Sequence, residues 1–135
     1  MRMSDVGLYI VTLNNETPLS VNANDPRIAH KCIHVTRANC KFGKAKSLAR
    51  RRENYCKVFG RANVNFRPIA LTSDIGPAER LVLSALGEWR VRGSTGRKNE
   101  WLVRIAETEV ERIALATLSS AGIAFLVPLQ AAHAN

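Results

Sequence analysis

Residues 41–55, which read KFGKAKSLARRRENY, decide the fold because a β-prone stretch gives way to a helical one within them. Ser47 offers a hydroxyl that can accept an orphan backbone N–H, as side chains at helix N-caps do. The pattern predicts a helix from Leu48 to about Phe59. Gly60 follows at the position where helices favour glycine.

Two further stretches on either side of this helix predict strands. Residues 7–13 (GLYIVTL) are rich in β-forming side chains and end at two asparagines, and residues 65–71 have a similar composition. Residues 14–27 are expected to form a loop. Residues 28–42 contain a second β-prone stretch, and the pattern leaves open whether it forms one bent strand or two.

The second half of the chain predicts two more helices. One should begin near Pro77, which suits a first helical turn, and run to about Leu86. Residues 90–99 read as a flexible basic loop, and residues 100–105 as a short extended segment. The apolar spacing of residues 107–121 predicts an amphipathic helix. This order predicts an α/β (α+β) fold, with a small, mainly antiparallel three-stranded sheet packed with helices.

The length of 135 residues fits one domain, expected over residues 1–130 with a flexible tail at 131–135. The hydrophobic fraction of 46% supports an ordered core. The longest apolar stretch is far shorter than the ~20 residues that span a membrane, and no signal-peptide pattern follows the N-terminus. Three cysteines without C-x-x-C spacing suit a reducing compartment. We therefore expect a cytoplasmic protein with no membrane partner.

The net charge of +9 predicts a polyanionic partner, because the basic residues are clustered rather than spread evenly. Residues 41–67 carry nine Lys or Arg side chains against one acid, Glu53. A second basic group lies at residues 90–98, whereas acids gather at residues 107–111. The alternative is a basic surface that is merely solvated; the clustering favours nucleic acid.

The chain resembles the GIY-YIG nuclease superfamily in the order of its motifs. Gly7-Leu8-Tyr9 is followed by Lys41-Phe42-Gly43, then by a helical arginine, Arg51, and by Glu79 on a later helix. The segment from Gly43 to Tyr55 is especially similar to the nuclease domain of the excision-repair incision subunit. The resemblance covers residues 7–105 and implies a GIY-YIG-like fold and a metal-dependent endonuclease that cuts DNA.

The resemblance also implies a role for five candidate catalytic residues. Tyr9 would lie near the attacking water, Lys44 beside the phosphate, and Arg51 would stabilise charge on the phosphate. Tyr55 would assist proton transfer, and Glu79 would bind Mg²⁺ or Mn²⁺. These roles suit the residue types, because Arg donates to phosphate oxygens and Mg²⁺ accepts one carboxylate with several waters. A tyrosine near a metal and several cations could have a lowered pKa.

Further polar residues are candidates for contacting nucleic acid around this site. They are Lys41, Lys46, Arg50, Arg52, Arg90, Arg92, Arg97, Lys98 and Asn99. The resemblance also matches Asn99 with a late asparagine of the family. Glu100-Trp101-Leu102 resembles the ending of a related branch whose second motif also carries a lysine.

Lys41 stands where the family has a tyrosine, and this departure supports an alternative function. The alternative is a catalytically inactive GIY-YIG-like module that binds nucleic acid without cutting it. A third reading is a basic inhibitor that targets another protein, and a homodimer or a protein partner is left open. The alternating His30, Cys32 and His34 raise a minor hypothesis of a zinc site.

Overall fold

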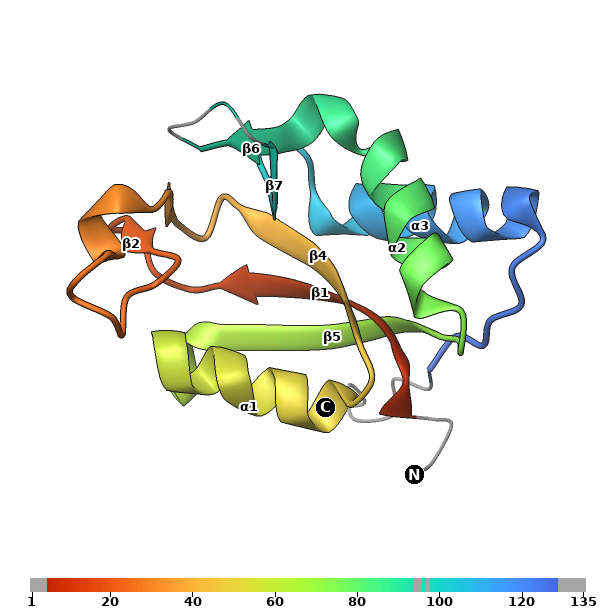
Figure 1. The fold of residues 1–135 in the computed structure, drawn as a ribbon, viewed down its shortest axis with the longest axis horizontal. Helices are drawn as coiled ribbons and strands as arrows, with labels where there is room; N and C mark the ends of the chain where they lie inside the picture. The colour runs from red at the N-terminus through yellow and green to blue at the C-terminus, as the bar shows by residue number, and fades with distance from the viewer. Residues whose placement is uncertain (1–4, 94–95, 97, 129–135) are drawn as a thin grey trace.

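The computed structural model describes residues 5–93, 96 and 98–128. A five-stranded antiparallel sheet with the order β5-β1-β4-β7-β6 lies between helices (Figure 1). Its strands are β1 (Gly7–Leu13), β4 (Cys40–Ala45), β5 (Val64–Leu71), β6 (Arg90–Arg92) and β7 (Lys98–Leu102). The helices are α1 (Leu48–Phe59), α2 (Ile75–Ala85) and α3 (Glu107–Ala121). The α+β class is thus confirmed, whereas the three-stranded sheet is corrected to five strands.

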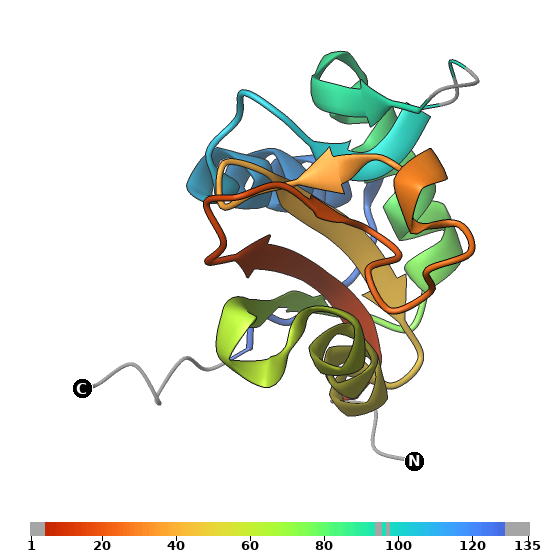
Figure 2. The same cartoon turned by 90° about the vertical axis from the view of Figure 1, so that its left-hand side faces the viewer.

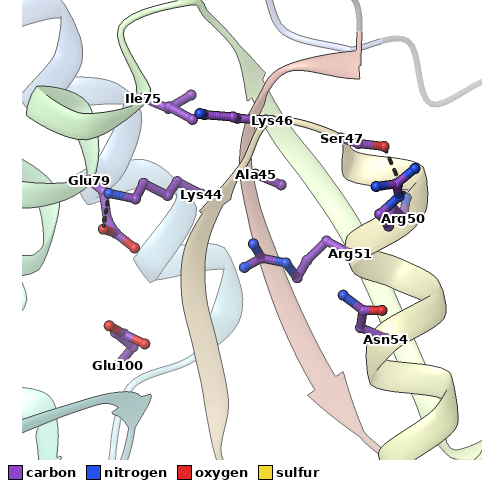
Figure 3. A pocket seen from close by; sticks show the side chains of 10 residues that line it. All are labelled: Lys44, Ala45, Lys46, Ser47, Arg50, Arg51, Asn54, Ile75, Glu79 and Glu100. Carbon is purple, nitrogen blue, oxygen red and sulfur yellow. Dashed lines mark hydrogen bonds and ion pairs between the residues drawn. The ribbon is translucent and has the colours of Figure 1, made fainter.

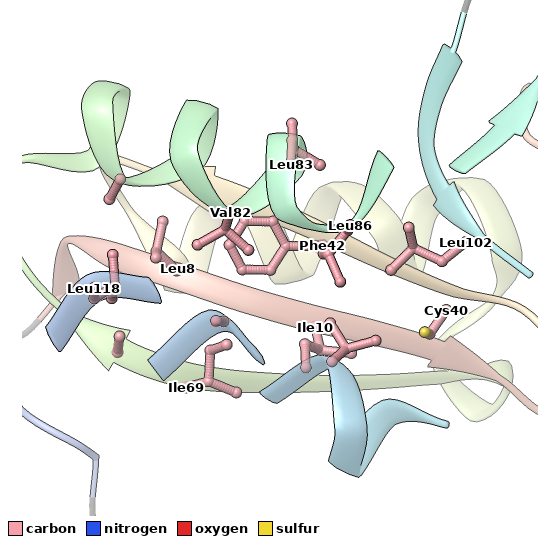
Figure 4. Packing of buried hydrophobic residues seen from close by; sticks show 14 residues of the cluster. Leu8, Ile10, Cys40, Phe42, Ile69, Val82, Leu83, Leu86, Leu102 and Leu118 are labelled. Atoms are coloured by element: carbon pink, nitrogen blue, oxygen red, sulfur yellow. The ribbon is translucent and has the colours of Figure 1, made fainter. Parts of the chain in front are cut away.

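Strand β1 is buried on both faces, because successive side chains of a strand point to opposite sides of its sheet. Leu8 and Ile10 belong to the core cluster under α2 and α3 (Figure 4). Tyr9 and Val11 belong to a second cluster that includes side chains of α1. Figures 1 and 2 show α1 on one side of the sheet and the α2–α3 pair on the other.

The helix predictions are largely confirmed. Helix α1 begins after Ser47, whose hydroxyl accepts a hydrogen bond from the Arg50 backbone N–H at 3.2 Å. Helix α3 ends at Gly122, which adopts the left-handed conformation with φ 73°. Helix α2 begins at Ile75, earlier than expected, so Glu79 lies beyond its first turn.

The prediction of a basic loop at residues 90–99 is wrong at both ends of that range, because β6 and β7 form an antiparallel hairpin there. Turn-forming residues dominate the sequence pattern of this segment. The structure adds long-range support that the pattern lacks: Trp101 pairs with Lys41 and Leu102 with Cys40, both on β4. Both Trp101 and Leu102 are buried, so the hairpin is anchored to the core.

The β-prone stretch at residues 28–42 forms two strands rather than one. Strand β3 (His34–Val35) pairs with β2 (Leu19–Ser20) in a separate two-stranded sheet, and β4 joins the main sheet. The described part of the chain also forms the short 3₁₀ turns η2 (Ala29–Lys31), η3 (Arg61–Asn63) and η4 (Gly87–Trp89). The connection from β1 to β4 thus forms an arm, orange in Figure 2, that packs through Val35.

No helix in the described part of the chain is both long and apolar enough to cross a membrane. The tail expected at residues 131–135 lies outside the described residues.

Candidate functional site

A surface pocket of about 550 Å³ opens between α1 and α2, along one edge of β4 (Figure 3). Strand β7 pairs with β4 at Cys40 and Lys41, and the part of β4 beyond this pairing contributes Lys44 and Ala45 to the pocket. Six charged side chains line it: Lys44, Lys46, Arg50, Arg51, Glu79 and Glu100. Four cations and two carboxylates therefore meet at one hollow, which suits an anionic ligand.

Helix α1 brings Arg50, Arg51 and Asn54 to the pocket, since residues three and four apart share a helix face. Arg52, the next residue along, lines a different and smaller hollow that also contains Phe66. Two of the three consecutive arginines thus reach the site. Arg52, expected to contact nucleic acid around the site, lies away from the pocket.

Arg51 is held by a pair of buried tyrosines that come from β1 and α1. Its Nη1 donates to the Tyr9 hydroxyl at 3.2 Å, and the Tyr9 and Tyr55 hydroxyl oxygens lie 2.8 Å apart. Tyr9 also stacks on Phe66, with ring centroids 4.7 Å apart. Tyr9 and Tyr55 belong to the core and Arg51 to the pocket wall, so the tyrosines support the arginine from behind.

Gly43 lets the Tyr9 ring lie directly against β4. The two residues are cross-strand partners in the β1–β4 ladder. A Cβ atom at position 43 would lie 2.5 Å from the Tyr9 hydroxyl oxygen and 2.6 Å from Cζ. The glycine of the second motif is therefore needed for the position of the tyrosine of the first.

Burial raises the pKa of Tyr9 above its ordinary value, although its hydrogen bonds with Tyr55 and Arg51 act in the opposite direction. Burial also raises the pKa of Tyr55, and the proximity of Tyr9 adds to the effect. In the chain itself the pKa of both tyrosines is therefore raised rather than lowered, because loss of solvent outweighs the neighbouring cation. At neutral pH both tyrosines keep their protons and serve as hydrogen-bonding groups.

Glu79 and Lys44 form an ion pair on the α2 side of the pocket. The Lys44 Nζ lies 3.4 Å from Glu79 Oε1, and Figure 3 shows this contact. The Glu79 side chain is 14% exposed, so its carboxylate is a well-held oxygen donor. A hard carboxylate oxygen in a water-accessible pocket fits Mg²⁺ or Mn²⁺, which would keep several water ligands.

Lys41 lies behind the pocket wall and pairs with Glu100, which is part of that wall. The Lys41 Nζ lies 3.8 Å from Glu100 Oε1 and 5.1 Å from the centroid of the Tyr55 ring. Burial lowers the pKa of Lys41, while the carboxylate of Glu100 opposes that shift. Lys41 is absent from the described residues that line the pocket, so its charge would act through the wall rather than by direct contact.

The basic residues of the β6–β7 hairpin that the structure describes, Arg90, Arg92 and Lys98, do not line the pocket. Arg90 donates to the backbone carbonyls of Asn99 and Lys98, and Arg92 donates to the carbonyl of Gly96. These two arginines therefore brace the hairpin. Lys98 is exposed and Asn99 is half-buried, and Arg97 lies outside the described residues.

Among the pocket residues that sequence reasoning missed, Asn54 and Glu100 are the two with an amide or a carboxylate side chain. Asn54 follows Arg51 by three residues, so helical spacing alone could have found it. Glu100 comes to the site because β7 pairs with β4, and nothing local in the sequence shows that pairing.

Three or more potential metal ligands of the His, Cys, Asp or Glu type do not cluster anywhere in the described residues. His30 lies in the η2 turn rather than on a strand, and the His34 ring nitrogen Nδ1 contacts the Cys32 carbonyl at 3.0 Å. The alternation that suggested a zinc site is therefore not a strand face. Glu79, the metal-binding residue that the resemblance implies, is therefore the candidate that the structure retains.

No family model, curated protein or solved structure matches this chain. The motif resemblance and the geometry of the pocket are therefore what support a function.

Proposed function

We propose that the protein is a divalent-metal-dependent endonuclease of the GIY-YIG type that hydrolyses DNA phosphodiester bonds. One observation carries the proposal: Arg51 on α1 and Glu79 on α2 line one pocket, and the buried Tyr9–Tyr55 pair from β1 and α1 contacts Arg51 from behind. Tyr9 and Glu79, the first and last of these residues, are 70 positions apart in the sequence (79 − 9), so the fold rather than chain proximity brings the set together, and this supports the proposal.

Each pocket residue has a chemical task in this proposal. Arg51 donates hydrogen bonds to the scissile phosphate and offsets the charge that builds up during attack. Lys44 adds a second positive charge when it leaves Glu79, and Tyr9 holds the guanidinium in place. Glu79 would hold the metal ion, which when bound supplies Lewis-acid polarisation of a phosphoryl oxygen.

The surrounding cations would bind the DNA backbone without reading its sequence. Lys46 and Arg50 are exposed and line the same pocket as Arg51. Phosphate contacts of this kind supply most of the salt-sensitive affinity of DNA-binding proteins. The exposed Lys98 would extend the contact surface along the hairpin.

A module that binds nucleic acid without cutting it is the second candidate, and two features favour it. Lys41 replaces the tyrosine of the second motif, and both Tyr9 and Tyr55 are buried rather than open to the pocket. Neither hydroxyl is therefore placed against substrate by the protein alone. Binding would still use Arg50, Arg51 and Lys46. Both candidate functions therefore predict affinity for nucleic acid, and only the nuclease predicts cleavage.

The test measures nicking of supercoiled plasmid with Mg²⁺ or Mn²⁺, alongside DNA affinity. Glu79→Gln and Arg51→Ala should each lower the nicking rate by about a hundredfold, the cost of removing one charge-stabilising group. Glu79→Gln should retain affinity because it removes a negative charge. Arg52→Ala and Glu88→Gln are matched controls, since Arg52 lines another hollow and Glu88 is exposed on η4.

The outcomes separate the candidates. Nicking that survives both Glu79→Gln and Arg51→Ala would show that the assigned site is not responsible. Salt-sensitive DNA binding with no nicking by the wild-type protein would select the binding module. Binding to neither DNA nor RNA would favour the protein-directed inhibitor.

A further inference from the structure

Glu100 is one of two carboxylates at the wall of a pocket that also carries four cations. It lies on β7, immediately before Trp101, which is 3% exposed and pairs with Lys41 across the ladder. The Phe59 and Trp101 rings meet edge to face with centroids 6.0 Å apart, so this part of the hairpin is fixed against α1. The position of Glu100 is therefore set by packing of its neighbour.

The partner of Glu100 is a lysine whose side chain is 20% exposed. Few solvent molecules reach the Lys41 ammonium, so it depends on protein groups to stabilise its charge. Two such groups are present: the Glu100 carboxylate at 3.8 Å and the face of the Tyr55 ring at 5.1 Å. A cation within about 6 Å of an aromatic centroid is attracted to the ring.

The same Tyr55 side chain continues toward the catalytic arginine. Its hydroxyl lies 2.8 Å from that of Tyr9, which accepts a hydrogen bond from Arg51 at 3.2 Å. Contacts thus run from Glu100 on β7 to Lys41 on β4, then to Tyr55 on α1, Tyr9 on β1, and back to Arg51 on α1. Each contact constrains the side chain that makes the next one.

We propose that Glu100 is a positioning residue, which holds the Lys41 ammonium against the Tyr55 ring and through this contact fixes the Tyr55–Tyr9–Arg51 hydrogen bonds. The part that concerns cleavage rests on the proposed nuclease function. The part that concerns the position of Lys41 does not require any activity. No hydrogen bond or ion pair of the described residues joins Glu100 to Tyr9 or Arg51, so the proposed positioning runs through Lys41 and Tyr55.

The alternative role for Glu100 is that of an exposed acidic residue whose only effect is electrostatic repulsion of DNA. That alternative and the proposal predict different results for Glu100→Gln, which removes the charge and keeps the shape. Loss of repulsion alone would tighten DNA binding and leave the rate of cleavage of bound DNA unchanged. A positioning role predicts unchanged or tighter binding together with a cleavage rate lower by about tenfold or more, because Arg51 loses its alignment.

The decisive measurement is made on the protein without DNA. The aromatic ring of Tyr55 shields nearby protons, so the NMR signal of the Lys41 side-chain Cε group should be displaced by the ring current. Loss of that signal in Lys41→Met identifies it. Glu100→Gln should return the signal toward the position of an ordinary lysine, and Glu100→Asp, which keeps the charge on a shorter stem, should return it only partly.

Glu109→Gln is the matched control, because Glu109 is an ion-paired glutamate on α3 and its loss changes the net charge equally. It should leave the Lys41 signal and the cleavage rate unchanged. A Lys41 signal that keeps its position in Glu100→Gln would overturn the proposal. If the Lys41 signal of Glu100→Gln returns toward that of an ordinary lysine while the cleavage rate stays normal, the link to Arg51 is overturned. If the signal returns in the same way but the wild-type protein never cuts DNA, the positioning of Lys41 is upheld and the proposed nuclease function is rejected.

Discussion

Two glycines at the motif strands show how a single side chain can be excluded by its neighbours. A Cβ atom at Gly7 would lie 2.1 Å from the Ala70 carbonyl oxygen on β5, and one at Gly43 would meet the ring of Tyr9. Both distances are well below normal contact, and one of the two obstacles is rigid backbone. Glycine is therefore required at both positions by packing, because neither has the positive φ that favours this residue.

Gly43→Ala should destabilise the fold by about 1–3 kcal/mol, the usual cost of overpacking a well-filled interior. The added methyl group must displace the Tyr9 ring, which would also disturb the hydrogen bond to Arg51. Urea denaturation followed by circular dichroism measures the change. Gly76→Ala in α2 is the control, since the nearest atom lies 3.9 Å away, and it should be neutral or slightly stabilising. Equal effects of the two substitutions would contradict the packing argument.

Helix α1 carries more of the site than any other element, and its start is set locally. Ser47 caps its N-terminus, and Asp5 accepts a hydrogen bond from the Ala49 N–H at 3.2 Å. These contacts fix the first turn, which in turn directs Arg50 and Arg51 to the pocket.

Ser47→Ala should cost about 1 kcal/mol of stability, because one backbone N–H of the first turn loses its acceptor. Thermal unfolding monitored at the helix signal gives the value. Ser84→Ala, on an exposed position late in α2, provides the comparison and should change little. If Ser47→Ala unfolds at the same temperature as the wild-type protein, the capping bond does not contribute measurably to stability.

Elements with local signals could be predicted from the sequence, and those that depend on distant pairing could not. Helix α1 has a capping serine and a terminal glycine, and α3 has an apolar period and Gly122, so both were predicted at their observed bounds. Residues 100–102 of β7 fall within the predicted extended segment. Residues 90–99 of the β6–β7 hairpin predict a loop because glycines and charged residues dominate their sequence, whereas the hairpin is anchored by the pairing of Trp101 with β4. The same reason explains why Glu100 was missed at the site.

The distribution of unpaired positive charge over the molecule also differs from what the sequence clusters suggest, although the net charge is the same. Arg67 belongs to the basic stretch, yet it lies between β5 and α3 and bonds Glu107 at 3.0 Å and Glu111 at 2.7 Å. Arg61 pairs with Glu53 in a similar way. The acids that cluster near residue 107 thus neutralise an arginine 40 positions away, and the pocket keeps its own cations.

Stability at alkaline pH should reflect the three buried acidic groups in the core. Burial raises the pKa of Cys40 to about 12, and the pKa values of Tyr9 and Tyr55 are raised as well. The unfolded chain loses these protons first, near about pH 8.5 for cysteine and pH 10 for tyrosine. Their contribution is therefore complete below those values and is lost as the pH rises toward the folded-state values.

Tyr55→Phe should be less stable than the wild-type protein at pH 7, through the lost hydroxyl contact, yet lose less stability above about pH 10. Lys41, whose lowered pKa acts in the opposite direction, is present in both proteins and largely cancels in the comparison. Urea midpoints measured from pH 7 to strongly alkaline buffer give the two curves. Parallel curves would show that Tyr55 does not titrate with unfolding.

Salt dependence distinguishes the cations that would meet DNA from those already neutralised within the fold. Arg50 is exposed and lines the pocket, whereas Arg112 is exposed on α3 and paired with Glu109. Each phosphate contact releases counterions, so losing one lowers the slope of log affinity against log salt by about 1. Arg50→Ala should show that decrease and Arg112→Ala should not, although both remove one positive charge. Fluorescence anisotropy with a short labelled duplex measures the slopes. Equal decreases would mean that DNA responds to the overall charge of the protein, and the pocket would then have no special part in binding.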